Sequence, residues 1–429
     1  MVVGISRKAS KLNTLRELLK GDLNFHEKDS AYASHNFHAF AAKFPPQLPK
    51  VFIQGLTDRG DVVLDPMMGS GTTIVEAFLA GRKAVGFDID PLAVRLCRVK
   101  VTPLDVERLT ALGEEVLNGA RWLLAAPTVV TEELSRRFDP KTKEFIDYWF
   151  LPHTQRELMA LIVAIENVKD EAIRDFLELT FSSIIITKSG GVSMARDLAH
   201  TRPHRDETKV PQSALIAFEH RLKKNIAGIT ELRSGEGTVE LYSGDARALT
   251  LTDESVDLVV TSPPYANAID YMRAHKFSLV WLGCRVEELT RLRTTYIGSE
   301  KVSVTNLAFL PDRAETVIRK LAQQDPRKAK VLRKYFTDMS DAISEMYRVL
   351  RPNTAAIIVI GTSTIRGINV ETHLCLADIA AEIGFRVAGI ADRQLDRNRR
   401  MMPARLTRSA SIIEQRIHEE YVIGLLKPM

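Results

Sequence analysis

The strongest constraint on the fold is a short apolar segment that ends in an acid and continues into a glycine-containing turn. Residues 62–64 are apolar, Asp65 follows them, and Gly69 and Gly71 lie in the turn before residues 72–80, which have the composition of a helix. A buried strand, a turn whose backbone can approach a ligand, and the positive end of a helix begin many α/β nucleotide sites. The pattern therefore predicts a sheet with a ligand-binding first turn.

A second apolar segment, residues 83–88, follows this helix and also ends in an acid, Asp88. The strand–turn–helix–strand unit spans fewer than about 30 residues, which is the length of a βαβ unit. Asp88 has the position of an acid that binds ribose hydroxyls. The turn lacks the Gly-Lys-Ser/Thr ending that binds triphosphates, which argues against an NTPase. We therefore expect an adenosine-type ligand.

Composition limits the class of protein without defining its function. The chain has 429 residues and a net charge of +5, and its pI of about 9.0 suits a nucleic-acid partner without requiring one. Cys97, Cys284 and Cys375 are widely separated, so we expect reduced thiols in a cytoplasmic protein and no metal site. No apolar run is long enough to span a membrane, and no signal peptide is apparent.

Hydrophobic periodicity divides the chain into four parts. Residues 1–34 form a polar, peripheral segment. Strand and helix patterns alternate in residues 35–103, the cofactor half of the core, and again in residues 238–429, the catalytic half. Between them, apolar residues recur at helical spacing in residues 104–237. We expect an α/β core of about seven strands that is split by a mostly helical insertion.

Three further predictions concern the catalytic half. The sequence predicts a helix over residues 266–283, an irregular basic segment over residues 285–301, and one long helical region over residues 320–350.

The sharpest motif, Thr-Ser-Pro-Pro-Tyr, follows residues 256–260, which are apolar except for Asp257 and have the pattern of a strand. Pro263 and Pro264 lack amide hydrogens and have a restricted φ, so the local carbonyl groups are rigidly held acceptors. Ser262 adds a hydroxyl, and Tyr265 offers a ring for stacking. These groups suit the exocyclic amino group of a flat base. The alternative interpretation is a rigid proline turn with Tyr265 in the core.

Together, the two motifs resemble those of the S-adenosylmethionine-dependent DNA amino-methyltransferases, which form N4-methylcytosine or N6-methyladenine. The resemblance covers residues 35–100 and 238–429, and it implies a Rossmann-like, seven-stranded methyltransferase core with S-adenosylmethionine as cofactor. The implied catalytic residues are Ser262, Pro263, Pro264 and Tyr265. The implied cofactor-binding residues are Lys43, Pro45, Asp65, Pro66, Gly69, Ser70, Gly71, Thr72, Thr73, Asp88, Asp245 and Ala246.

The first residue of the catalytic motif bears on the target base. In this family, Ser before Pro-Pro-Tyr goes mostly with cytosine and Asp or Asn mostly with adenine, so Ser262 favours cytosine N4. The resemblance implies that the base is rotated out of the duplex and stacked on Tyr265. Ser262 and the carbonyl of Pro263 would accept the amino hydrogens. No Pro-Cys pair occurs in the chain, which argues against cytosine C5 methylation because that reaction needs a thiolate.

Three alternative functions stay open: N6-adenine methylation of DNA, guanine-N2 methylation of RNA, and nucleic-acid binding without catalysis. The expected partners are double-stranded DNA and a cognate restriction endonuclease. Candidate target-recognition segments are the insertion and residues 285–312. The basic segments 188–205 and 393–408 are candidates for contacts with backbone phosphates. Neither the recognition sequence nor the oligomeric state follows from the sequence.

Overall fold

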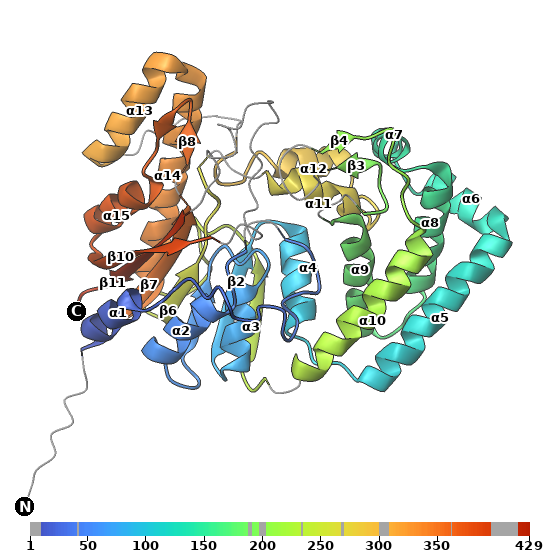
Figure 1. Cartoon of the computed structure of the whole chain (residues 1–429), viewed down its shortest axis with the longest axis horizontal. Coiled ribbons are helices and arrows are strands. Elements are labelled where there is room, and N and C mark those ends of the chain that lie inside the picture. Colours follow the sequence, from blue (N-terminus) through green and yellow to red (C-terminus); the bar gives the residue numbers. More distant parts are fainter. Residues whose placement is uncertain are drawn as a thin grey trace, which may run out of the picture.

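A seven-stranded sheet forms the centre of the molecule (Figure 1). The computed structural model describes residues 10–40, 43–187, 191–196, 203–232, 235–266, 270–299, 309–361, 363–395 and 419–429. The strands of the sheet are β1 (Val62–Asp65), β2 (Lys83–Asp88), β5 (Thr238–Ser243), β6 (Val256–Thr261), β7 (Leu350–Gly361), β10 (Arg386–Gln394) and β11 (Glu419–Leu426).

The strand order identifies the type of sheet. It runs β10-β11-β7-β6-β1-β2-β5. The pairs from β5 through β7 are parallel, whereas β11 is antiparallel to both of its neighbours. The chain extends outward from β1 to β5 and then returns to β6 on the other side of β1, so the topological switch point lies between β1 and β6. Ligands bind at such a point, beyond the carboxyl ends of the strands. The predicted Rossmann-like methyltransferase fold is confirmed.

Helices cover both faces of this sheet. One side carries α1 (Lys11–Lys20), α2 (Gln47–Leu56), α3 (Thr72–Leu79) and α4 (Pro91–Lys100), and the other carries α13 (Asp312–Gln324), α14 (Pro326–Val349) and α15 (Thr372–Ile383). Successive residues of β1 point to opposite faces. Val63 therefore packs in the core with α1 to α4, and Leu64 packs in the core with α13 to α15.

The insertion is mostly helical, as the sequence predicts. Figure 1 shows its helices as a group beside the sheet, next to α4. They are α5 (Val106–Ala125), α6 (Pro127–Arg136), α7 (Pro140–Trp149), α8 (Pro152–Glu166), α9 (Glu171–Ile185) and α10 (Ala214–Leu232), with a small hairpin of β3 (Ala195–Arg196) and β4 (His204–Arg205). Arg95 of α4 forms an ion pair with Glu178 of α9. One hydrophobic core continues from the sheet into the insertion, so the domain boundaries remain a sequence prediction.

Three segments of the catalytic half differ from the sequence prediction. The predicted irregular segment contains a helix, α12 (Val286–Leu292), whose start is capped where Glu288 accepts from the backbone N–H of Arg285 at 3.3 Å. The predicted long helix is two helices, α13 and α14, because Pro326 begins a new helix after Asp325. The helix predicted from residue 266 is α11 (Tyr271–Leu279), and residues 267–269 lie outside the described residues.

A second small hairpin consists of β8 (Thr364–Ile365) and β9 (Ile368–Asn369). No helix in the described ranges combines the length and the apolar character needed to cross a membrane.

Candidate active site

A cleft lies beyond the carboxyl ends of β1, β2, β5 and β6. It encloses about 870 Å³ of empty space, including its open mouth. The predicted site residues that line it are Lys43, Asp65, Pro66, Gly69, Ser70, Thr72, Asp88, Asp245, Ala246, Ser262 and Pro264. Those that do not line it are Pro45, Gly71, Thr73, Pro263 and Tyr265. Two motifs that are far apart in the sequence therefore open into one cleft.

The turn after β1 requires glycine for two different reasons. Gly69 and Gly71 have φ angles of 45° and 75°, in the left-handed region that other residues rarely adopt. A β-carbon on Gly69 would lie 3.1 Å from the ring of Phe40, and one on Gly71 would lie 2.3 Å from Sγ of Cys97. The backbone of the turn is thus pressed between the residues that precede α2 and helix α4.

Asp65 connects the turn with the catalytic motif. Its carboxylate accepts hydrogen bonds from Oγ1 of Thr261 at 2.7 Å and from the backbone N–H of Met67 at 3.2 Å. Thr261 is the last residue of β6, directly before Ser262. Burial raises the pKa of Asp65 to about 6. Because one carboxylate binds both segments, it holds the glycine turn and the catalytic motif at a constant separation.

Asp88 ends β2 and forms part of the cleft wall. Its carboxylate accepts from the backbone N–H groups of Gly69 and Asp90, each at 2.8 Å. Burial, together with the negative charge of Asp90, raises the pKa of Asp88 to about 7. A partly exposed carboxylate at this position is suited to accept hydrogen bonds from the hydroxyls of a ribose.

Sequence reasoning missed Asp90 as a cleft residue. Its carboxylate caps α4 by accepting from the backbone N–H of Leu92 at 2.9 Å. The other oxygen lies 2.6 Å from Nδ1 of buried His275 on α11. Burial raises the pKa of Asp90, but His275 and the hydrogen bonds that the carboxylate accepts together outweigh it, so the net shift of the pKa is downward. No sequence signal indicated this pair, because its members are 185 residues apart.

Sequence reasoning also missed Arg247. Its Nε and Nη2 donate to the two oxygens of Asp245 at 2.9 and 2.6 Å, and its Nη1 donates to Asp338 at 2.8 Å. Arg247 lines the cleft beside Asp245, which the family resemblance implies to be a cofactor-binding residue. The ion pair leaves Asp245 fixed and partly neutralised, which favours hydrogen bonding over charge recognition.

The residues of the catalytic motif point in different directions. Ser262 and Pro264 face the cleft. Tyr265 is 7% exposed, and its hydroxyl donates to Oε1 of Glu420 on β11 at 2.7 Å. In this structure the ring of Tyr265 therefore lies in the core, as in the alternative interpretation of the motif as a rigid proline turn. Stacking of Tyr265 on a base stays a prediction. Phe40 and Tyr271 present aromatic side chains to the cleft.

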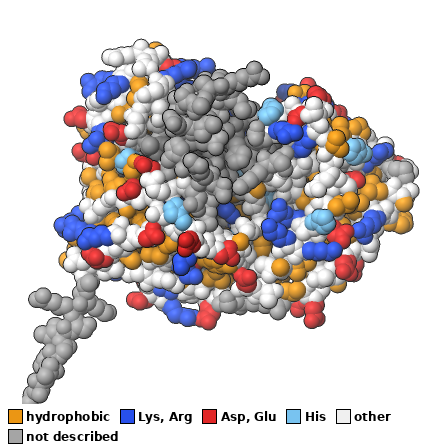
Figure 2. All heavy atoms as spheres, in the orientation of Figure 1, with side chains coloured by type: hydrophobic (Ala, Val, Ile, Leu, Met, Phe, Trp, Pro, Cys, Tyr) orange, Lys and Arg blue, Asp and Glu red, His pale blue; other side chains and the backbone are white. Residues whose placement is uncertain are grey.

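The predicted phosphate contacts are only partly within the described residues. Arg196 pairs with Asp206, and Arg205 pairs with Glu207 at 3.0 Å. The candidate segment 393–408 begins at Arg393, which is buried and paired with Glu420 and therefore does not face a phosphate. Residues 188–190, 197–202 and 396–408 lie outside the described ranges. Basic and acidic side chains are interspersed over the face shown in Figure 2.

Comparison with known proteins shows which enzymes this chain is similar to. Residues 18–98 match the family model described as DNA methylase. The type II methyltransferase M.MvaI from Kocuria varians is 24% identical over 404 residues, which cover 87% of this chain and 86% of that protein. M.AvaI from Nostoc sp. is 24% identical over 366 residues, with 76% and 74% covered. M.BsoBI from Geobacillus stearothermophilus is 22% identical over 406 residues, with 82% and 78% covered.

Proposed function

We propose that this chain, which belongs to the S-adenosylmethionine-dependent DNA amino-methyltransferases, methylates the N4 amino group of cytosine in double-stranded DNA. The observation that carries the proposal is that Ser262 and Pro264 face the same cleft as Asp65 and Asp88. A hydroxyl and a proline-rich turn suit an amino group that must be held next to a methyl donor. Ser262 in the first position of the catalytic motif favours cytosine over adenine.

The residues of the cleft fit the cofactor. Gly69 of the glycine turn lines the cleft without a side chain, and Asp88 offers a carboxylate to the ribose hydroxyls. The acidic groups Asp65, Asp88 and Asp90 all line the cleft, and their negative field suits a sulfonium cation. When bound, S-adenosylmethionine supplies an electrophilic methyl group.

The catalytic motif would act by positioning the target amino group. Ser262, which faces the cleft, would accept one of its hydrogens. The carbonyl of Pro263, a residue that does not line the cleft in this structure, would accept the other when the base is bound, and the two contacts would orient the nitrogen lone pair. Orientation and preorganised dipoles contribute the largest rate effects in reactions of this kind. No strong base is needed, because the methylated nitrogen becomes acidic and can lose its proton to solvent. We also propose a role as the modification partner of a restriction endonuclease, because the relatives above are type II methyltransferases.

Nucleoside analysis tests the proposed reaction. The full chain is incubated with S-adenosylmethionine and a mixture of unmethylated DNA sequences, and the DNA is then digested for mass spectrometry. We expect N4-methylcytosine. If N6-methyladenine is the only methylated nucleoside found, the target base is adenine and the proposal of cytosine is wrong. Labelling of RNA in a parallel reaction, with no labelling of DNA, would overturn the DNA substrate.

A variant of the catalytic motif tests the assignment of the pocket. We expect Ser262→Ala to lower kcat by at least about 100-fold, because a preorganised polar contact to the reacting group is lost. The cofactor Kd should stay within about twofold, because Ser262 is not proposed to bind the cofactor. Ser255→Ala, which changes a serine just before the opposite end of β6, is the matched control and should leave both constants unchanged. A large rise in cofactor Kd for Ser262→Ala would contradict the assignment.

A further inference from the structure

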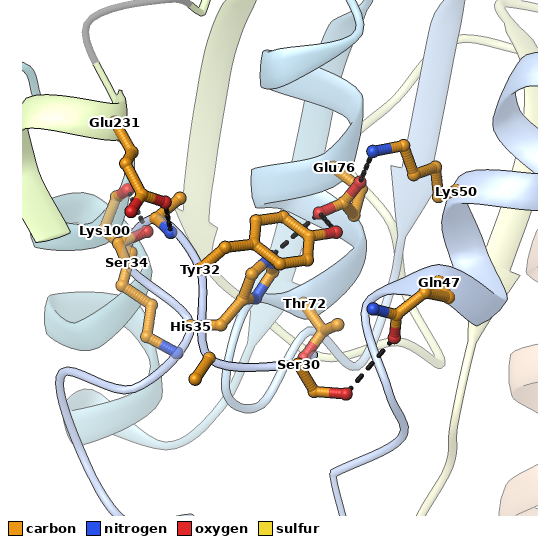
Figure 3. Close-up of polar contacts among 12 residues, drawn as sticks. Ser30, Tyr32, Ser34, His35, Gln47, Lys50, Thr72, Glu76, Lys100 and Glu231 are labelled. Atoms are coloured by element: carbon orange, nitrogen blue, oxygen red, sulfur yellow. Dashed lines mark hydrogen bonds and ion pairs between the residues drawn. The ribbon is translucent and has the colours of Figure 1, made fainter. Parts of the chain in front are cut away.

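A buried carboxylate on α3 has no role in the chemistry described above. Glu76 lies one turn after the glycine turn, is 1% exposed, and does not line the cleft. A buried carboxylate is costly unless hydrogen bonds compensate for the lost hydration. Figure 3 shows that the compensating groups come from the chain before α2. We call residues 30–40 and 43–46 the leading segment.

Two side chains of the leading segment converge on Glu76. The hydroxyl of Tyr32 donates to Oε1 at 2.7 Å, and Nε2 of His35 lies 2.9 Å from the same oxygen. Burial lowers the pKa of His35 to about 4, so the ring is neutral at pH 7 and donates from Nε2. Lys50 of α2 lies 3.9 Å from the other oxygen. Glu76 is thus the point on α3 where the leading segment is attached.

The attachment continues to the wall of the cleft. The backbone carbonyl of His35 accepts a hydrogen bond from Nζ of Lys43 at 2.7 Å. Lys43 lines the cleft, and so do Phe40 and Phe44 of the same segment. The ring of Phe40 packs over Gly69, in the turn that α3 follows. His35 therefore connects the carboxylate of Glu76 on one side with a cleft side chain on the other.

A second connection runs from the leading segment through Lys100, at the end of α4, to the glycine turn; Ser34 and Lys100 are labelled in Figure 3. The hydroxyl of Ser34 donates to the backbone carbonyl of Lys100 at 2.7 Å, and Nζ of Lys100 donates to the carbonyl of Ser70 at 2.7 Å. Lys100 is fully buried. The leading segment is thus bonded to α3 through Glu76 and, through Lys100 of α4, to the glycine turn. Displacement of the segment would therefore disturb the residues that line the cofactor cleft on both sides.

We propose that Glu76 is a positioning residue for cofactor binding. Through His35 it holds Lys43 and the aromatic side chains of the leading segment in place against the cofactor. This inference rests on the cofactor cleft and not on which base is methylated. A residue with this role sets the affinity for the cofactor, whereas the rate at saturating cofactor depends on the catalytic motif.

The test measures S-adenosylmethionine binding by calorimetry with the full chain and no DNA. We expect Glu76→Gln and His35→Leu each to raise the cofactor Kd by about tenfold, since each leaves a buried polar group without its partner. His35→Gln keeps an N–H donor and should restore the Kd to within about twofold of the unchanged protein. With saturating cofactor, kcat for all three variants should stay within about twofold.

Two further variants separate positioning from general destabilisation. Gln47→Ala removes bonds that also tie the leading segment to α2, through Ser30 and Asp29, but not to Glu76. It should leave the cofactor Kd unchanged. Combining Glu76→Gln with Lys43→Met should raise the Kd no more than the larger single change, because both act through one connection.

An unchanged cofactor Kd in folded Glu76→Gln would overturn the proposal, as would a multiplicative effect in the double variant. A fall in kcat without a change in Kd would overturn it as well. If Glu76→Gln does not fold, His35→Leu and its combination with Lys43→Met decide by the same criteria. Failure to methylate any DNA would refute the proposed function but would leave these binding results as the test of Glu76.

Discussion

Replacement of Gly71 by alanine tests whether the glycine turn is constrained by its neighbour as well as by its backbone angle. Gly71 has a φ of 75°, where a residue with a β-carbon is strained by about 1–2 kcal/mol. The added β-carbon would also lie 2.3 Å from Sγ of Cys97, a fully buried side chain on α4. Overpacking of this kind costs about 1–3 kcal/mol. We therefore expect the free energy of unfolding to fall by about 2–5 kcal/mol.

Urea denaturation with two companion variants separates these contributions. Gly60→Ala is the control for backbone strain, because Gly60 has a φ of 87° and nothing lies within 4 Å of its added β-carbon. It should lose only about 1–2 kcal/mol. In the Gly71→Ala/Cys97→Ala double variant the collision is removed, so the combined loss should be smaller than the sum of the single losses by about 1–3 kcal/mol.

Two results would refute this reasoning. One is a loss for Gly71→Ala no larger than that for Gly60→Ala. The other is a double variant whose loss equals the sum of the single losses within about 0.5 kcal/mol, which would show that Cys97 does not restrict the turn.

Three more predictions follow from the buried polar groups. The pKa of Asp88 is raised to about 7, so the free protein takes up a proton there as the pH falls, and cofactor binding must release it. Calorimetry should show a constant cofactor Kd above about pH 8 and, below pH 7, a Kd that rises by up to about tenfold for each unit by which the pH falls. Asp88→Asn should abolish this pH dependence. Lys100→Met leaves a buried carbonyl without its donor and should lower the free energy of unfolding in urea by about 1–3 kcal/mol. Tyr265→Phe should cost about 1–3 kcal/mol, whereas Tyr421→Phe, which loses an exposed bond of the same type, should cost less than about 0.5 kcal/mol.

Local features of the chain were predictable because their causes are local. The turn at Gly69 and Gly71 follows from a strand, two glycines and a helix within a short stretch, and the cap at Asp90 follows from the proline after it. The division of residues 320–350 between two helices has an equally local signal, Pro326, which begins the second helix. The helix α12 was missed because it spans only Val286–Leu292, which is too short for the spacing of its apolar residues to be distinctive.

The contacts that complete the cleft were not predictable in the same way. Asp90 meets His275, and Glu76 meets His35, across distances in sequence that no periodicity connects. Arg247 lies only two residues from Asp245, but its contact with Asp338 on α14 fixes the geometry of both. Such pairs depend on how helices and strands pack, and packing is the sum of many contacts.

The glycine turn and the catalytic motif show what the sequence determines and what the tertiary structure determines. By itself, the sequence determined the class of the fold, the glycine turn after β1 and the two motifs, because strand period, helix period and backbone freedom act over a few residues. Only the tertiary structure decided that both motifs open into one cleft and that Tyr265 is held by Glu420 of β11. Those outcomes depend on strand order and on burial, which bring distant residues into contact and remove water from between them.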